Sequence, residues 1–231
     1  MKTTNVRPEE LNYDRYSMDK YDRDIINSIP HHKDLHSAIA VYVTKNFDRN
    51  HIYSVLDLGV GTGITSKLIQ DILPEAQFDA VDFSKKMLFG AKKKMGKKNV
   101  NYIFGDYSKI KFDRKYDIVV SVIGIHHQNS KGKKILFRKI YSLLKPGGVF
   151  IFGDLVTYKD AKKAALNQAL HFHHLVQKTP DVKTLAEWAH HHVELNDLAP
   201  VEDQAVWLRK IGFKVKVEMM KINTSLIICK K

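Results

Sequence analysis

Residues 54–66 read S-V-L-D-L-G-V-G-T-G-I-T-S, and this stretch decides the fold. An apolar run contains Asp57 near its end, and three glycines follow at intervals of two before a helical pattern begins. Glycines between a strand and a helix let the backbone approach a ligand closely. The dinucleotide fingerprint G-x-G-x-x-G requires its third glycine where this chain has Ile64. Because Asp57 would also repel a pyrophosphate, the loop favours a ligand with an ammonium or a sulfonium.

Strand and helix patterns alternate after this loop. Apolar runs typical of strands lie at 52–58, 76–82, 100–106, 116–122 and 149–154, and helical patterns lie at 65–73, 87–95 and 133–144, the last one stopped by K-P-G-G. This alternation predicts parallel βαβ units in an α/β fold with a doubly wound sheet. Two further strand patterns, at 213–220 and 224–230, are separated by only a few residues and predict a closing antiparallel hairpin.

Two helical segments do not follow this alternation of strands and helices. Residues 9–46 are amphipathic, and residues 159–195 predict two helices with no strand between them, before a further helix at 200–211. We expect both segments to cover the carboxyl edge of the sheet, where ligands bind in open α/β folds. The chain is predicted to be a single domain, 1–231, with a helical N-terminal lid (1–50), a cofactor-binding core (51–155), a helical His-rich insert (156–199) and a closing helix with a β-hairpin (200–231).

Composition narrows the class of protein. A chain of 231 residues is long enough for one substantial domain. It has a single cysteine, Cys229, no apolar run near the ~20 residues of a membrane span, and no signal-peptide pattern at its start, so we expect a cytoplasmic protein. The net charge is +13, and residues 85–98 hold seven lysines and no acid. Such a run is typical of a solvated helix face, but it also suits an RNA partner.

Three predicted strands each carry an acid at or near the carboxyl end: Asp57, Asp82 and Asp106. A carboxylate at the end of the second strand can accept hydrogen bonds from both hydroxyls of a ribose. Asp106 could accept from the exocyclic amine of an adenine, although an aspartate after a glycine also caps loops. Phe83 or Tyr107 could pack on the same ring. Together these acids predict a nucleoside that carries a cationic group.

At this point the chain resembles the class I S-adenosylmethionine-dependent methyltransferases of the small-molecule type. The resemblance rests on five motifs in order: L-D-L-G-V-G-T-G, V-D-F-S-K-K-M-L, G-D-Y, Y-D-I-V-V-S-V-I-G-I-H-H and L-L-K-P-G-G-V-F-I-F-G-D. It implies a Rossmann-like sheet of seven strands, the last one antiparallel, and S-adenosyl-L-methionine as the methyl donor. The cofactor-binding residues it implies are Asp57, Gly59, Gly61, Thr62, Gly63, Asp82, Phe83, Met87, Asp106, Tyr107 and Ser121.

Several acceptor classes can be argued against. A cytosine C5 methyltransferase needs a cysteine near the fourth strand, and Cys229 lies on the last one. Enzymes that methylate amino groups of nucleic acids carry N/D-P-P-Y/F after the fourth strand, where this chain reads S-V-I-G-I-H-H. His126 and His127 follow that strand. Each is a candidate general base, because a histidine pKa near 6.5 suits the task, or a residue that only lines the pocket.

The predicted insert and lid add further polar residues. His171 and His174 share one helix face, and Glu187, His190 and His191 gather on another. These five are candidate ligands of a divalent transition metal such as Zn, Fe or Mn, and the alternative is a solvated polar face. In the lid, a tyrosine could close over the donor, and three histidines could face the pocket. The lid candidates are Tyr13, Tyr16, Tyr21, His31, His32 and His36.

The leading hypothesis is therefore a methyltransferase that acts on a small or medium-sized acceptor enclosed by the two helical segments. One alternative is a tRNA or other RNA methyltransferase, favoured by the lysines and testable by salt-dependent RNA binding. Another is a non-catalytic protein that binds S-adenosylmethionine or a metal, which turnover would refute. The sequence leaves the acceptor and the oligomeric state open.

Overall fold

The computed structural model describes residue 11 and residues 18–231 of the chain. Within them, one seven-stranded sheet has the order β3-β2-β1-β4-β5-β7-β6. Strands β1 to β5 are parallel, and β7 is antiparallel to both β5 and β6. This confirms the predicted Rossmann-like sheet with an antiparallel last strand. The strands are β1 (Ser54–Leu58), β2 (Gln77–Asp82), β3 (Val100–Phe104), β4 (Tyr116–Val122), β5 (Leu144–Leu155), β6 (Lys214–Lys221) and β7 (Thr224–Lys230).

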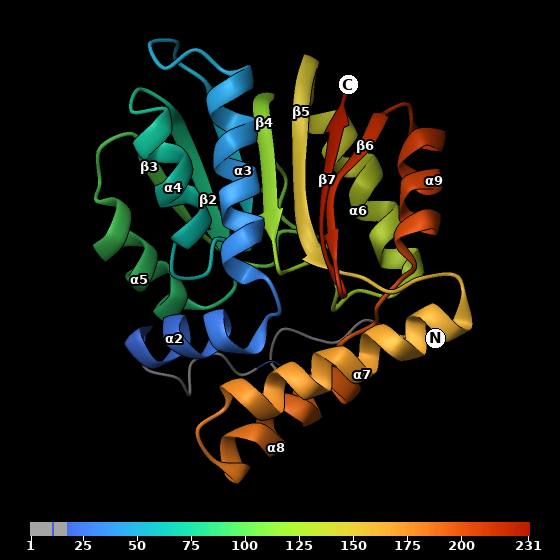
Figure 1. Ribbon diagram of the computed structural model, residues 1–231. Coiled ribbons are helices and arrows are strands. Elements are labelled where there is room, and N and C mark those ends of the chain that lie inside the picture. The colour runs from blue at the N-terminus through green and yellow to red at the C-terminus, as the bar shows by residue number, and fades with distance from the viewer. Residues whose placement is uncertain (1–10, 12–17) are drawn as a thin grey trace.

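Helices cover both faces of the sheet (Figure 1). One face packs on α3 (His32–Asn46), α4 (Ile64–Ile72) and α5 (Lys85–Met95), and the other on α6 (Ser130–Leu143) and α9 (Val201–Ile211). Strand β1 shows how the sequence specifies both layers. Val55 belongs to the core under α3–α5, whereas Leu56 belongs to the core under α6 and α9. Successive side chains of a strand point to opposite faces, so an apolar run fills both cores.

A third group of helices lies at the carboxyl ends of the strands, at the bottom of Figure 1. It consists of α2 (Met18–Ser28), α7 (Ala161–Lys178), α8 (Val182–His190) and a π-helical turn, η2 (His191–Leu195). These elements share a small apolar core that includes Ile25, Leu175 and Trp188. The predicted pair of insert helices is therefore present over this edge. None of the described helices is long and apolar enough to cross a bilayer.

Helix α3 differs from its predicted place. Most of it packs on a face of the sheet, and only its start, with His32 and His36, reaches the carboxyl edge. Its fully buried residues Leu35, Ile39 and Val43 are four positions apart, so they form one stripe that faces the central core. Only α2, of the described N-terminal helices, lies over the edge.

Strand β5 begins earlier than predicted. Helix α6 ends at Leu143, and the strand starts at Leu144, so K-P-G-G lies inside the strand and does not separate it from the helix. Leu144 pairs with Tyr116, and the next pair is Ile118 with Val149. This register shift accommodates the extra residues of the K-P-G-G segment.

Candidate active site

A cavity opens at the carboxyl ends of the central strands, and we call it the donor cavity. Nine of the eleven predicted cofactor-binding residues line it: Asp57, Gly59, Gly61, Thr62, Asp82, Phe83, Met87, Asp106 and Tyr107. Gly63 and Ser121 are not among its lining residues. The β1–α4 loop forms one wall, because parallel strands bring their carboxyl ends to the same edge of the sheet.

The glycine loop keeps the backbone exposed to the donor cavity. Gly61 has a φ of +55°, a value that favours glycine. Its amide donates to Asp82 Oδ2 at 2.8 Å, and Ser84 N donates to Oδ1 of the same carboxylate at 2.9 Å. Gly63 has a φ of +85°, and a Cβ there would meet Ala91 Cα at 3.1 Å. Gly63 therefore allows the loop to pack closely against α5, on the side away from the donor cavity.

Asp57 brings a buried carboxyl group to the wall of the donor cavity. Ser66 Oγ donates to its Oδ2 at 2.6 Å. Burial raises the pKa of Asp57 to about 7, despite that hydrogen bond. A cation placed beside this carboxyl group would stabilise its ionised form. The site thus fits the ammonium or sulfonium that the sequence predicted.

Asp106 and Tyr107 form the far side of the donor cavity. Burial acts to raise the pKa of Asp106, but hydrogen bonds from the hydroxyl and amide of Ser108 lower it overall. Asp106 therefore caps its own loop as well as lining the cavity. The Tyr107 ring packs against Gly59, where a Cβ would lie 3.7 Å from Cε1, and its hydroxyl donates to the Gly124 carbonyl at 3.1 Å.

Ser121 forms a hydrogen bond between two strands of the sheet. Its buried hydroxyl donates to the Leu58 carbonyl at 2.8 Å, which links β4 to β1. The resemblance placed Ser121 among the cofactor residues. In the structure its hydroxyl instead bonds within the sheet, next to the donor cavity.

Helix α2 forms the roof of the donor cavity. Tyr21 lines the cavity from this helix. Asp22 accepts hydrogen bonds from the hydroxyl of Thr62 and, at 2.6 Å, from Lys94 Nζ. These contacts tie the helix to the glycine loop and to α5. The position of α2 therefore suits the predicted lid.

The other lid candidates separate into three groups. Tyr13 and Tyr16 lie outside the described residues. His32 and His36 line the donor cavity, as the sequence suggested. His31 does not line it and instead pairs with Asp34 at 2.9 Å.

A second, smaller cavity lies beside the donor cavity, under α7, α8 and η2. The two cavities share Ile25 and Ile123 in their walls. His126 lines the second cavity, whereas His127 lines the donor cavity, and their ring centroids are 4.0 Å apart. The two predicted catalytic histidines therefore stand at the boundary between the cavities.

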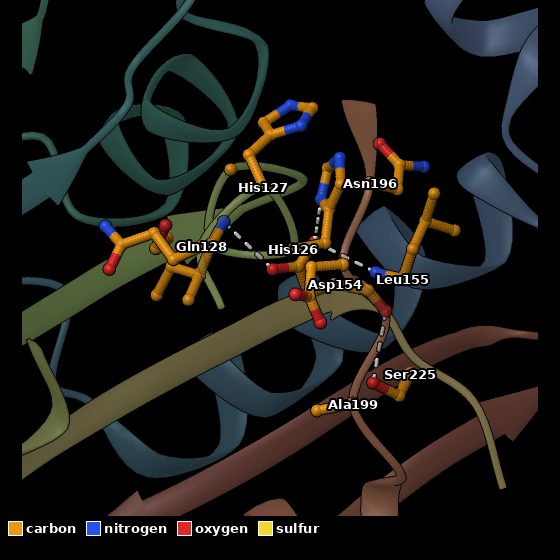
Figure 2. Close-up of polar contacts among 12 residues, drawn as sticks. His126, His127, Gln128, Asp154, Leu155, Asn196, Ala199 and Ser225 are labelled. Atoms are coloured by element: carbon orange, nitrogen blue, oxygen red, sulfur yellow. Dashed lines mark hydrogen bonds and ion pairs between the residues drawn. The ribbon is translucent and has the colours of Figure 1, made fainter. Parts of the chain in front are cut away.

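His126 is fixed by a buried carboxyl group (Figure 2). Its Nδ1 lies 2.5 Å from Asp154 Oδ1, and Asp154 also accepts from the amides of Leu155 at 2.9 Å and Ile125 at 3.0 Å. Burial raises the pKa of Asp154 to about 7 and lowers the pKa of His126 to about 3. With both carboxylate oxygens accepting amide hydrogens, we assign the Nδ1–H of a neutral His126 as the donor to Asp154.

His127 is fixed by the insert. Its Nδ1 lies 3.1 Å from the carbonyl oxygen of Leu195 in η2. A carbonyl can only accept, so Nδ1 carries the hydrogen and Nε2 carries the lone pair. Burial lowers the pKa of His127 well below its usual value. The insert therefore determines the tautomer of a residue that faces the donor cavity.

The predicted metal ligands of α7 have other partners. His171 Nδ1 lies 2.7 Å from the side-chain nitrogen of Asn223. His174 Nε2 lies 2.8 Å from the carbonyl oxygen of Asn27 in α2. These contacts join α7 to the β6–β7 turn and to the lid. They give both histidines a role in packing the insert.

The remaining predicted ligands also separate. His190 is exposed and Glu187 is half-buried. Among the described residues, His191 is the one of the five that belongs to a group of three potential ligands, together with His126 and His127, whereas His171 packs on a single further histidine, His192, with ring centroids 4.0 Å apart. Helix α8 ends at His190 and η2 begins at His191, whose amide still bonds to the Glu187 carbonyl.

Sequence reasoning missed Asp154, Asn196 and Lys133. A signal existed for Asp154, which ends the V-F-I-F-G-D run as the other acids end their strands. Asn196 lines the second cavity, and Lys133 is buried behind the His126 loop. Nothing in the local pattern marks either residue, because their neighbours come from distant parts of the chain.

Comparisons with known proteins agree with this geometry. Residues 55–148 match the family model described as a methyltransferase domain. A malonyl-[acyl-carrier protein] O-methyltransferase of Ilyobacter polytropus is 31% identical over 68% of this chain and 55% of its own length. A carboxy-S-adenosyl-L-methionine synthase of Campylobacter fetus is 26% identical over 67% of this chain and 65% of its own. The chain thus spans little more than half of the first of these relatives.

Solved structures share the fold. An O-methyltransferase family protein from Burkholderia thailandensis superposes with a TM-score of 0.70 at 15% identity, over 97% of this chain and 63% of that one. The sheet order, the acids at the strand ends and the methyltransferase domain matched over residues 55–148 together support a class I S-adenosylmethionine-dependent methyltransferase.

Proposed function

We propose that the protein transfers the methyl group of S-adenosylmethionine to a neutral hydroxyl group of a small acceptor, with His126 as the general base. The observation that carries this proposal is the buried His126–Asp154 pair at the boundary between the donor cavity and the second cavity.

The donor cavity fits S-adenosylmethionine, which when bound supplies an electrophilic methyl group. Asp57 offers a buried carboxyl group for the ammonium of the amino-acid part. Asp82 offers a carboxylate, already anchored by Gly61 and Ser84, for the ribose hydroxyls. Methyl transfer requires mainly that donor and acceptor be held in line, so these anchors supply much of what catalysis needs.

The second cavity is small and adjoins the donor cavity at Ile25 and Ile123, so an acceptor would place one end in it and extend into the donor cavity. Trp188 and Leu155 give it apolar walls. Asn196, which is 8% exposed, has a buried Oδ1 without a hydrogen-bond partner among the described residues. Buried polar atoms are normally satisfied, so an acceptor with a second hydrogen-bond donor would complete this site.

Charge favours a neutral acceptor. The described residues that line the second cavity include no lysine, arginine, aspartate or glutamate. Burial lowers the pKa of His171 to about 3 and that of His192 to about 4, so both are neutral near pH 7. A carboxylate would lose its hydration there without gaining a counter-ion, which is costly. The second cavity therefore suits a neutral acceptor better than the malonyl group that the name of the Ilyobacter relative contains.

A hydroxyl acceptor must lose a proton as it is methylated. With Nδ1–H directed at Asp154, His126 has its lone pair on Nε2, the nitrogen that can take this proton. Burial lowers the pKa of His126 in the free protein, so the base depends on the Asp154 carboxylate to stabilise the imidazolium that forms, as a buried carboxylate does for a catalytic histidine. Asp154 is in this view an orienting partner of the base.

The test is methyl transfer from donor carrying a labelled methyl group to a panel of small phenols, alcohols and carboxylic acids of matched size. We expect methylation of hydroxyl compounds, and a loss of about 10²–10⁴-fold in turnover for His126→Ala with donor affinity retained. His173→Ala, an exposed change on α7, is the control. Preferential methylation of the carboxylates, or wild-type turnover in His126→Ala, would overturn the proposal. Donor binding without any turnover would favour the non-catalytic alternative.

An RNA acceptor is the second candidate, and the surface of α5 favours it. Lys93 Nζ lies 4.9 Å from the Phe89 ring centroid, and Phe89 is 54% exposed. Lys85 Nζ lies 5.1 Å from the ring of Phe104, which is 56% exposed. Aromatic rings among lysines can stack with unpaired bases. Titration with tRNA at two salt concentrations tests this candidate, because phosphate contacts predict weaker binding at higher salt. Salt-independent or absent binding would eliminate it.

A further inference from the structure

Three imidazoles converge at the boundary between the two cavities. One ring nitrogen from each of His126, His127 and His191 lies within 4.8 Å of the others. The ring centroids of His127 and His191 are 5.3 Å apart, at an interplanar angle of 77°. Two of these residues follow β4, and the third begins η2, so the group exists only because the insert docks on the sheet edge.

The hydrogen bonds of His126 and His127 fit metal ligands. In each ring Nδ1 is engaged, by Asp154 Oδ1 in one case and by the Leu195 carbonyl oxygen in the other. Each neutral ring therefore has its lone pair on Nε2. A histidine bound to a metal almost always donates its other ring hydrogen to a carboxylate or a backbone carbonyl, and both arrangements are already built here.

The third histidine, His191, lies at the start of an irregular helical turn. Helix α8 ends at His190, and the chain continues as η2, the π-helical turn His191–Leu195. π-helical turns are rare in proteins, and those that occur are often found at functional sites. The ring of His191 also packs on Trp188, with centroids 5.7 Å apart. His191 keeps an α-helical backbone, with its amide bonded to the carbonyls of Glu187 and Trp188, so its side chain leaves the helix on a different side from that of the exposed His190 one residue earlier.

We propose that His126, His127 and His191 form a binding site for a divalent first-row transition metal, with zinc as the best match. Three imidazoles suit zinc, whose Zn–N distances of about 2.0–2.1 Å require the nitrogens to close to roughly 3.4 Å in a tetrahedron. The nitrogens lie within 4.8 Å of one another, so metal binding requires the three rings to approach each other by at most about 1.4 Å.

Metal and acceptor would then exclude each other. A metal on Nε2 of His126 takes the lone pair that the general base needs. Zinc is therefore expected to inhibit methyl transfer reversibly, and this consequence rests on the proposed function. Metal binding itself does not rest on it, because it requires neither donor nor acceptor.

The direct test uses tag-free, chelator-treated protein and metal ions alone. Equilibrium dialysis with Zn²⁺ measures stoichiometry and affinity, and the visible absorption of Co²⁺ reports the coordination geometry. We expect one tight site per chain, with a cobalt spectrum typical of a tetrahedral site rather than an aqueous ion. Absence of stoichiometric binding, or an aqueous cobalt spectrum, would overturn the proposal.

Adjacent residues provide a matched pair of variants. His191→Ala removes a ligand and should weaken zinc binding at least tenfold, whereas His190→Ala removes an exposed histidine of the same segment and should leave it unchanged. His191→Gln serves as a second variant if the alanine form fails to bind donor. Equal zinc affinity in wild type, His190→Ala and His191→Ala would refute the assignment.

Activity then separates this inference from the proposed function. Each variant's turnover is compared with and without stoichiometric zinc. Wild type should be inhibited and recover on chelation, and His191→Ala should lose its sensitivity to zinc. If His126→Ala turns over normally while wild type still binds zinc, the general base is wrong and the metal site stands. If zinc neither binds nor inhibits while His126→Ala is inactive, the reverse holds.

Discussion

The ammonium of Lys133 donates a hydrogen bond to the carbonyl of Asp197 at 2.6 Å, although only 1% of the lysine is exposed. The same Nζ contacts the carbonyls of Gln128 and, at 3.4 Å, His126. Asp197 N in turn donates to the His126 carbonyl at 2.8 Å. One buried lysine thus holds the loop after β4 to the end of the insert. Burial lowers the pKa of Lys133 to about 8, which leaves it mostly cationic near neutral pH.

Lys133→Met should destabilise the protein and lower turnover. The variant keeps a similar length but leaves the carbonyls of Asp197 and Gln128 without this donor, a loss of about 2–4 kcal/mol in the free energy of unfolding. Chemical denaturation measures it. Lys131→Met, an exposed change two residues away, is the control and should stay within about 0.5 kcal/mol of wild type. Equal denaturation midpoints for the two variants would show that the hydrogen bonds of Lys133 do not stabilise the loop after β4.

Donor affinity should fall as the pH falls below about 7. The raised pKa of Asp57, about 7, means that this carboxyl group becomes protonated in the free protein below that value. A donor ammonium needs the ionised form, so its affinity is full above pH 7 and decreases by up to tenfold for each pH unit below it. Calorimetric titration with S-adenosylmethionine between pH 5 and 7.5 measures this. Asp57→Asn should bind weakly and show no such slope, and a flat wild-type profile would contradict the assignment.

Asp82→Ala should weaken donor binding by about 100-fold or more. Hydrogen bonds to a charged group contribute roughly 1.5–3 kcal/mol each, and two ribose hydroxyls depend on this carboxylate. The variant also frees the Gly61 amide, which loosens the glycine loop. Asp113→Ala, an exposed change, should bind donor normally. Near-normal affinity in Asp82→Ala would refute its role at the ribose.

His32 should make the protein sensitive to acid. Burial lowers its pKa from 6.5 to about 3, so between those values the unfolded chain binds a proton that the folded protein does not. The free energy of unfolding therefore rises with pH across this window, and His32 contributes up to about 1.4 kcal/mol per pH unit. His32→Gln should unfold with a shallower pH dependence between pH 4 and 6.5. Parallel curves for the variant and wild type would contradict a neutral buried His32.

Much of the donor cavity follows from local sequence. The apolar run that ends beyond Asp57 predicts a buried parallel strand, and parallel strands place their carboxyl ends at one edge. Asp57, Asp82 and Asp106 had to meet there once the βαβ order was recognised, and the structure places all three in the donor cavity. For Ser121 the same periodicity does not tell whether a polar group near a strand end faces a ligand or the neighbouring strand, and its hydroxyl bonds to the Leu58 carbonyl.

Periodicities of a few residues are enough to predict the order of strands and helices, the glycine loop and the acids around the donor. Which histidines meet depends on how the folded chain packs. His191 joins His126 and His127 across more than sixty residues of chain, and not Glu187 and His190 beside it. The physical reason is that the insert docks on the sheet edge through Leu195 and Lys133, which depends on packing between distant segments that no local spacing reveals.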